Sequence, residues 1–301
     1  MPKITIFPDG GKVAKAAGVN HKPPKREAAT GWSKAAARRN ADFLMSVDPL
    51  ACQDGEAISV SLTFGREDDV TPGLFRSVRE ALFQHLRRQG ILRLHWLAEF
   101  QRDGTPHFHM MVYYPFGVPA EERCRSLLNK WLTLAAFTGA KRQAQHIVPV
   151  TYLKGWKMYL AKHGARGVNH YQRQMPEGWD RPGRMWGYLG SWPTRRLELE
   201  VDDRTFFRYR RFVRSWRVAR ARQALRLAPD DRTARRTLLA ARRSLVEGEP
   251  GSSARTTFRG LSQWIPEAVQ VEFLQAVAME PEAMVRRWSD RAETPTCNTG
   301  V

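Results

Sequence analysis

Apolar residues recur at short intervals between residues 55 and 165, and two periods divide this stretch into elements. Alternation at every second position in AISVSLTFG predicts a strand. Two apolar runs, ILRLHWLAEF and HFHMMVYY, predict two more strands, which the turn signal Asp103-Gly104 separates. The predicted strands cover residues 57–65, 91–100, 107–114 and 144–150.

Helical patterns lie between and around these strands. Pro72 suits the first turn of one helix, and Gly90 lies just past its end. Gly139 ends a second helix that has acidic residues in its first turn. The predicted helices cover residues 31–48, 72–89, 119–139 and 152–163. The order strand, helix, strand, strand, helix, strand predicts a ferredoxin-like α+β fold, with an antiparallel sheet and helices on one face.

The composition of the chain changes on either side of these predicted strands and helices. The first residues are basic and rich in glycine, proline and lysine, which predicts a flexible arm, and residues 165–195 predict loops with one possible strand. From about residue 200 the chain is helical and dense in arginine, and its end predicts disorder. The predicted domains are an arm at 1–28, a core domain at 29–199, a basic helical region at 200–290 and a tail at 291–301.

Charge dominates the composition. The 301 residues carry a formal net charge of +19, with a sequence pI near 10.5, which favours a polyanionic partner such as nucleic acid. The three cysteines are far apart, which predicts a reducing compartment without a disulfide framework. No apolar run reaches about 18 residues, and the N-terminus lacks the apolar centre of a secretory signal, so we expect a cytoplasmic protein with no membrane partner.

Two histidines in the third strand carry the first candidate chemistry. His107 and His109 are two residues apart, so on a strand they point to the same face with Cβ atoms about 7 Å apart. One metal ion could sit between them, although neighbouring hydroxyl or carbonyl groups could equally satisfy both rings. Glu99 would join them if the hairpin loop has an odd length: a loop at 103–105 places it opposite His109. A two-residue loop would place Glu99 opposite Phe108, on the wrong face.

Such a mixed nitrogen and oxygen set suits Mg²⁺ or Mn²⁺, and Zn²⁺ stays open. In a basic protein it indicates phosphoryl chemistry on nucleic acid. The helix at 152–163 offers a nucleophile, because Tyr159 and Lys162 are three residues apart and share a face. A tyrosine can attack phosphorus while an ammonium group lowers its pKa or offsets phosphate charge. The alternative is a tyrosine packed in the core and a solvated lysine.

These motifs resemble those of a known family. GTPHFHMMV resembles the histidine–hydrophobe–histidine motif of the HUH endonucleases, and YLAKHG resembles their Tyr-x-x-Lys helix. The chain is most similar to the rolling-circle replication initiators of plasmids and single-stranded DNA phages, over roughly residues 55–165. The resemblance implies that Tyr159 nicks single-stranded DNA at a replication origin, with His107, His109 and Glu99 as ligands of a divalent metal.

The resemblance also implies that the 5′ phosphate stays on Tyr159 as an ester and that later transesterification rejoins the strand in the cytoplasm of a bacterial host. Two features depart from the family pattern. His163-Gly164 follows Tyr-x-x-Lys where relatives often repeat tyrosine or lysine, and Tyr152, two turns earlier, is the other candidate tyrosine. A Walker-type phosphate loop does not occur in the sequence, so we expect a host helicase to act in trans.

The arginine-rich region predicts DNA binding, and its alternative is a solvated helical bundle. The candidate DNA-binding residues are Arg208, Arg210, Arg211, Arg214 and Arg217. Other functions stay open at this point. A non-catalytic DNA- or RNA-binding protein would use the same basic helices, and a relaxase or single-strand transposase would share the HUH motif.

Overall fold

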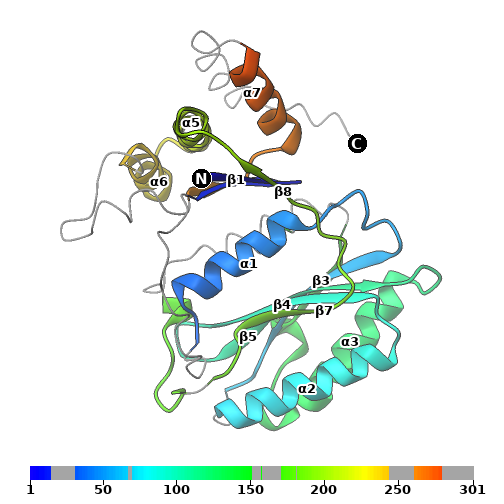
Figure 1. Cartoon of the computed structure of the whole chain (residues 1–301). Coiled ribbons are helices and arrows are strands. Elements are labelled where there is room, and N and C mark those ends of the chain that lie inside the picture. The colour runs from blue at the N-terminus through cyan, green and yellow to red at the C-terminus, as the bar shows by residue number, and fades with distance from the viewer. Residues whose placement is uncertain are drawn as a thin grey trace. The chain divides into compact units, whose positions relative to one another are not determined.

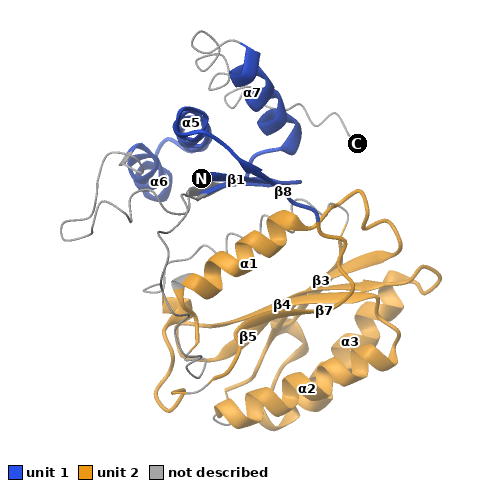
Figure 2. Cartoon of the chain, viewed as in Figure 1, with its two compact units in different colours: residues 1–21, 195–301 blue, residues 22–194 orange. Residues whose placement is uncertain are grey.

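The computed structural model describes residues 1–14, 31–66, 70–150, 157, 171–180, 182–243 and 261–279. The chain divides into two compact units, which Figure 2 colours separately: unit 1 comprises residues 1–21 and 195–301, and unit 2 comprises residues 22–194. Each unit contains helices and an antiparallel sheet, so the predicted α+β class is confirmed. The N-terminal residues belong to the same unit as the residues from 195 onward.

Unit 2 is built on a five-stranded sheet with the order β6-β3-β5-β4-β7, in which every neighbouring pair is antiparallel. Its strands are β3 (Glu56–Thr63), β4 (Arg93–Phe100), β5 (Pro106–Tyr114), β6 (His146–Pro149) and β7 (Trp186–Gly190). The four strands that the sequence predicts are present, and β7 adds an edge strand beside β4. The central strands β4 and β5 are buried along their whole length.

Helices cover both faces of this sheet (Figure 1). α2 (Pro72–Arg88) and α3 (Ala120–Leu134) lie on one face, and α1 (Lys34–Ser46) lies on the other. The two helices of the predicted order thus share one face, and α1, which precedes that order, adds a helix on the other. The reason is visible in β4: Trp96 contacts Phe83 of α2, whereas its neighbour His95 stacks on Phe43 of α1, because consecutive strand residues face opposite sides.

The ends of α2 follow the predicted signals. Thr71 caps its N-terminus by accepting a hydrogen bond from the Leu74 amide, and Pro72 occupies the first turn. Gly90 follows the helix with a φ of 69°, a left-handed conformation that glycine adopts without strain. Short 3-10 turns complete unit 2: η1 (Ala136–Thr138), η2 (Arg142–Ala144) and η3 (Tyr171–Arg173).

An aromatic cluster forms the core between the sheet and α2 and α3. Phe108 of β5 is fully buried at its centre, with its ring stacked on Phe75 at 4.8 Å and edge-on to Trp131 at 6.0 Å between ring centroids. Phe64 and Trp96 complete the contacts of Phe108 at 6.3 Å each. The residue between the two candidate metal ligands therefore belongs to the core.

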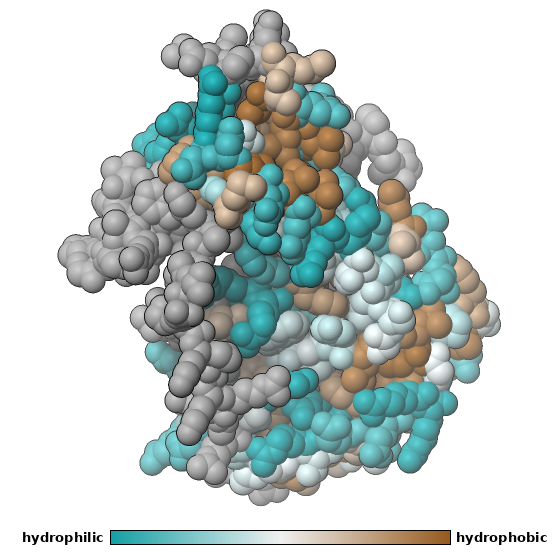
Figure 3. All heavy atoms as spheres, in the orientation of Figure 1, coloured by the Kyte–Doolittle hydropathy of each residue, from teal (hydrophilic) through white to brown (hydrophobic). Residues whose placement is uncertain are grey.

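Unit 1 has a four-stranded antiparallel sheet with the order β8-β1-β2-β9. Its strands are β1 (Lys3–Phe7), β2 (Gly10–Ala14), β8 (Leu197–Glu200) and β9 (Leu261–Gln263). Its helices are α5 (Asp203–Leu227), α6 (Arg232–Arg243) and α7 (Glu267–Met279). Apolar residues gather over α7 in the space-filling view (Figure 3).

Residues 3–14 form a hairpin where the sequence predicts a flexible arm. Ile4, Ile6 and Val13 are almost completely buried and pack with Phe206 and Phe212 of α5. The alternation of apolar and polar residues in β1 therefore has a core to face, but that core comes from residues 200 positions later in the chain. Such a partner leaves no local signal in the sequence.

Two side chains of unit 1 pack so closely against Gly11 of this hairpin that no larger residue fits at this position. A Cβ atom at Gly11 would lie 2.2 Å from the Tyr209 hydroxyl and 2.3 Å from Gln270 Oε1. These two side chains are buried and joined, because the Tyr209 hydroxyl donates to Gln270 Oε1 at 2.5 Å, and Gln270 Nε2 donates to the Gly10 carbonyl at 3.0 Å. Burial raises the pKa of Tyr209, so its hydroxyl stays protonated as a donor.

No helix in the described part of the chain is both long and apolar enough to span a bilayer.

Replacement of Phe108 by alanine tests the importance of the aromatic core. The change removes a fully buried ring, so we expect Phe108→Ala to lower the free energy of unfolding by about 3–5 kcal/mol in chemical denaturation. Phe116→Ala is a matched control, because Phe116 is 61% exposed in the loop after β5 and should cost less than about 0.5 kcal/mol. Equal losses for the two variants would contradict this description of the core.

Candidate metal centre

The hairpin between β4 and β5 decides which side chains share a face. Glu99 pairs with His107, and Leu97 pairs with His109. The loop between the strands covers five residues, 101–105, closed by a hydrogen bond from the Gln101 amide to the Thr105 carbonyl at 2.8 Å. Its length is odd, so Glu99 lies on the face of both histidines, as predicted. The expected pairing of Glu99 with His109 is wrong, because the loop is two residues longer than the expected 103–105 loop and Glu99 therefore pairs with His107.

The three side chains meet in a buried group. The Nε2 atoms of His107 and His109 are 3.1 Å apart, and Glu99 Oε2 lies 3.8 Å from His109 Nε2. One ligand atom from each of the three residues lies within 4.8 Å of the others. Glu99 is fully buried, and the two histidines are at most 6% exposed. The geometry therefore brings together the three residues that the sequence singles out.

This donor set fits a divalent ion. Two nitrogen ligands that each lie about 2.1 Å from one ion at right angles are about 3 Å apart, which matches the 3.1 Å between the imidazoles. Ser61 of β3 lies 3.0 Å from Nδ1 of His109. If Ser61 accepts a hydrogen bond from Nδ1–H of His109, the proton of the neutral ring is on Nδ1 and the lone pair of Nε2 points toward His107. This is the tautomer that a metal ligand needs. The sequence analysis missed Ser61, although the alternation in β3 places it on this face.

Arg173 is a further member of this site that the sequence did not indicate. Its Nε lies 3.9 Å from Glu99 Oε1, and both side chains are fully buried. Its guanidinium stacks over the ring of Trp32 at 4.0 Å, and Trp32 donates its indole hydrogen to the Ala98 carbonyl at 2.8 Å. Arg173 therefore balances the charge of Glu99 in the buried site. It lies in the short turn η3, inside a stretch that the sequence describes as loops, so no local pattern reveals it.

A third histidine on the same face has a different role. Nε2 of His95 lies 2.7 Å from Asn40 Oδ1 of α1, and its ring stacks on Phe43. Burial lowers the pKa of His95 to about 3, so the ring stays neutral at neutral pH. His95 is four residues before Glu99 and is not a member of the three-residue group. It joins α1 to the sheet.

The candidate nucleophile helix falls largely outside the described residues. Tyr159, Lys162 and Tyr152 all lie there, so their roles stay predictions. Lys157 is described: its side chain is fully buried, and its ammonium group donates to the Val47 carbonyl at the end of α1 at 2.6 Å. Lys157 therefore anchors this segment to the end of α1, and the alternative of a solvated Lys162 lies outside the described residues.

The arginines of α5 point in different directions. Arg210 is buried, and burial lowers the pKa values of both Arg210 and Arg217. Arg214 is partly buried and donates to the Arg242 carbonyl at 2.7 Å. Arg211 is exposed, and Arg208 is partly exposed. Of the five candidate DNA-binding arginines, these two are best placed to reach a partner.

Comparison with known proteins identifies the family of the chain. A family model described as "Replication-associated protein ORF2/G2P" matches residues 57–174, which include Glu99, His107 and His109. The chain is 37% identical over 293 residues to a "Putative replication protein" of Xylella fastidiosa strain 9a5c, covering 92% of this chain and 97% of that protein. It is 38% identical over 208 residues to the "Replication-associated protein G2P" of Pseudomonas phage Pf3, covering 67% of this chain and 74% of the phage protein. No solved structure matches the chain.

The buried site thus lies in the part of the chain that matches a family of replication-associated proteins. The chain belongs to the ORF2/G2P family of replication-associated proteins.

Removal of either histidine should remove metal binding. We expect calorimetric titration of the wild-type protein with Mn²⁺ to show one site, which His107→Ala and His109→Ala each lose because two ligands cannot hold the ion as three do. His85→Ala is the control, since His85 lies on α2, on the opposite face of the sheet. Unchanged Mn²⁺ affinity in both site variants would rule out this group as the metal centre.

Proposed function

We propose that this protein initiates rolling-circle replication as an HUH-type endonuclease that nicks and rejoins single-stranded DNA at a replication origin. The observation that carries the proposal is the buried group of Glu99, His107 and His109 in a chain of the replication-associated family. Two imidazoles and a carboxylate are ligands for a divalent ion, and a basic protein suits a DNA substrate.

The topology of unit 2 supports this class. The elements β3, α2, β4, β5, α3 and β6 follow one another along the chain, and β3 and β5 are neighbours in the middle of the sheet. This order is the one that the ferredoxin-like fold uses. We assign unit 2 to the HUH version of that fold, with the metal centre on the face that α1 partly covers and α2 and α3 on the opposite face.

His107, His109 and Glu99 would hold Mg²⁺ or Mn²⁺. Bound there, the ion would supply Lewis-acid polarisation of a DNA phosphate and would offset the negative charge that develops on it. Ser61 holds the ring of His109 in orientation, and Arg173 balances the carboxylate of Glu99. The three ligands arise from two adjacent strands, so the core that packs these strands also fixes the ligand geometry.

Tyr159 is the proposed nucleophile. Its phenolic oxygen forms a bond to phosphorus while the bond from phosphorus to the 3′ oxygen breaks, and the phenolic proton ends on the released 3′ hydroxyl. Lys162, three residues along the same helix, offsets the negative charge of the phosphate. The reverse reaction with another 3′ hydroxyl rejoins the strand. The ester keeps the energy of the broken bond, so cutting and joining need no nucleotide cofactor.

In this role the protein acts in the cytoplasm of a bacterial host. The 3′ hydroxyl would prime synthesis, and a host helicase would separate the strands. The resemblance to the initiators also distinguishes this role from that of a non-catalytic DNA- or RNA-binding protein, which would form no covalent bond to DNA.

The identity of the nucleophile can be tested on oligonucleotides tiled from the replicon that encodes the protein. We expect Tyr159→Phe to eliminate the covalent protein–DNA band on denaturing gels with Mn²⁺ present, because the change removes only the hydroxyl. Tyr152→Phe should keep the band and serves as the matched control. A band that survives in Tyr159→Phe but disappears in Tyr152→Phe would move the nucleophile two helical turns earlier.

A stripe of arginines on α5 is the proposed contact with the DNA backbone. With about 3.6 residues per turn, one face of the helix gathers five arginines, which span about 33 Å along the axis. They are Arg204, Arg208, Arg211, Arg222 and Arg226. All but Arg208 are exposed, and Arg208 is partly exposed. Of the five arginines that density in the sequence indicates, the stripe keeps Arg208 and Arg211, whereas Arg210 is buried and Arg214 donates to the Arg242 carbonyl.

The stripe should contribute to DNA affinity in a salt-dependent way. We expect the triple variant Arg208→Gln, Arg211→Gln, Arg222→Gln to lower the slope of log affinity against log salt by about two to three, since each lost phosphate contact removes nearly one. The matched control replaces Arg87, Arg88 and Arg125, exposed residues of α2 and α3. An unchanged slope in the α5 variant would place the stripe outside the DNA footprint.

A further inference from the structure

An arginine and a tyrosine are stacked on the surface of unit 2 beside the candidate metal centre. The Cζ atom of the Arg102 guanidinium lies 5.3 Å from the centroid of the Tyr171 ring. Arg102 is exposed, and Tyr171 is 41% exposed. A cation at this distance is attracted by the face of the ring. The pair therefore presents a positive charge and an aromatic surface side by side to a partner.

Two independent connections place this pair next to Glu99. Arg102 is three residues after Glu99, in the loop that follows β4, so their Cα atoms are at most about 11 Å apart. Tyr171 is the first residue of η3, and the last residue of that turn is Arg173, whose Nε lies 3.9 Å from Glu99 Oε1. Because Arg173 reaches the carboxylate itself, η3 lies on the sheet face of the three candidate ligands. A DNA strand with one phosphate at the metal centre therefore has an adjacent nucleotide within reach of the pair.

Both residues of the pair stand on backbone that is held in place. The amide of Gln174 donates to the Tyr171 carbonyl at 3.2 Å and closes the η3 turn. Arg173 anchors the same turn, because its guanidinium stacks over the ring of Trp32 at 4.0 Å. The loop that carries Arg102 is closed by the backbone hydrogen bond at its base. A ligand that binds the pair does not have to order the backbone beneath it, which lowers the entropic cost of binding.

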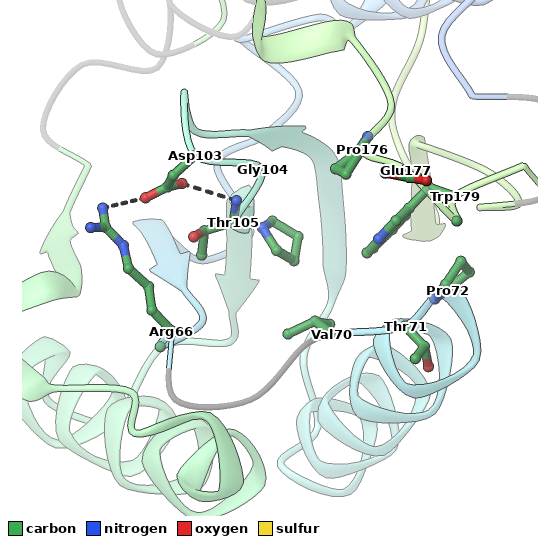
Figure 4. A pocket seen from close by; sticks show the side chains of 13 residues that line it. Arg66, Val70, Thr71, Pro72, Asp103, Gly104, Thr105, Pro176, Glu177 and Trp179 are labelled. Carbon is green, nitrogen blue, oxygen red and sulfur yellow. Dashed lines mark hydrogen bonds and ion pairs between the residues drawn. The ribbon is translucent and has the colours of Figure 1, made fainter.

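The charge of Arg102 is not neutralised by its acidic neighbour in the sequence. Figure 4 shows that the Asp103 carboxylate is ion-paired with Arg66 and accepts a hydrogen bond from the Thr105 amide, at 3.0 Å. Within the described part of the chain, Arg102 forms no ion pair with any carboxylate. Its guanidinium therefore keeps its donors for an anion from outside the protein, and a DNA phosphate matches their planar fork.

We propose that Arg102 and Tyr171 form a subsite that binds the nucleotide next to the cleavage position of single-stranded DNA. The inference rests on the proposed function and specifies how that site selects single strands. The Tyr171 ring stacks on the base, and the Arg102 guanidinium contacts the phosphate beside it. Stacking on an aromatic ring accepts any base, because every base has a π-face. A base in a duplex is already stacked and paired, so the subsite favours single strands over duplexes.

The test measures fluorescence anisotropy of an oligonucleotide from the replicon and of its duplex, each with the full-length protein in EDTA so that binding is separated from cleavage. We expect Tyr171→Ala to weaken single-strand binding about 5- to 100-fold, the loss of one stacked base, and to leave duplex binding unchanged. Tyr171→Phe keeps the ring and should retain single-strand affinity. Phe116→Ala is the matched control, because Phe116 is an exposed ring beyond the opposite end of β5. Equal loss on both DNAs, or no loss on either, would overturn the proposal and leave the pair as a tie between the hairpin loop and η3.

A second variant avoids any effect of Tyr171 on folding. Arg102 is exposed in the hairpin loop, so Arg102→Gln should fold normally. It should lower the slope of log single-strand affinity against log salt by about 0.7, the contribution of one phosphate contact. Arg125→Gln is its matched control, because Arg125 is an exposed arginine on α3. An unchanged slope in Arg102→Gln would remove the phosphate contact from the subsite.

Single abasic positions in the oligonucleotide locate the subsite along the strand. We expect one abasic position, next to the nick that the covalent adduct marks, to weaken binding by the wild type but not by Tyr171→Ala. A sensitive position far from the nick would overturn the placement beside the metal centre. A covalent adduct in a protein whose single-strand binding does not depend on Tyr171 would reject the subsite alone, and Tyr171-dependent binding without an adduct would reject the endonuclease alone.

Discussion

The alternation of side chains in β5 is the constraint on which the rest of unit 2 depends. Phe108 lies between His107 and His109 in sequence and points to the opposite face, where it forms the centre of the aromatic core. A slip of one residue in the pairing with β4 would bury both imidazoles against α2 and α3 and turn Phe108 toward Glu99. Unpaired polar groups in the core are costly, so packing and site geometry select the same register. The packing of the hydrophobic core therefore also positions the three residues of the candidate metal centre.

On the sheet face that carries the candidate centre, Arg173 balances the charge of Glu99, and α1 packs nearby. Glu99 is fully buried, and an uncompensated carboxylate there would be costly. Arg173 lies beside it and stacks on Trp32, which itself bonds to the β4 backbone. Lys157 donates to the end of α1 from the segment that contains the proposed nucleophile. α1 thus contributes to the site through contacts at both of its ends, although it supplies none of the three candidate ligands.

Local patterns were enough to predict the order of elements in unit 2 and the ends of α2. They left the face of Glu99 dependent on the length of the hairpin loop. The pairing of Glu99 with His107 was not predictable, since the loop length depends on a backbone hydrogen bond between Gln101 and Thr105 that any residue type could make. The contact of Arg173 with Glu99 was also not predictable from the sequence. Its partners lie more than seventy residues earlier in the chain, and a contact at that separation leaves no periodic signal.

In the basic helix α5, the number of arginines does not by itself tell which of them a partner can reach. Arginine is abundant throughout α5, but this helix also packs on the sheet of unit 1 through Phe212 and on α6 through Val218. These two contacts occupy two sides of the helix, so an arginine is available to DNA only where neither contact covers it. Arg210 and Arg217 fall on covered sides, where burial lowers their pKa values. The packing of α5, and not its charge alone, therefore sets the surface that this helix can offer to a polyanion.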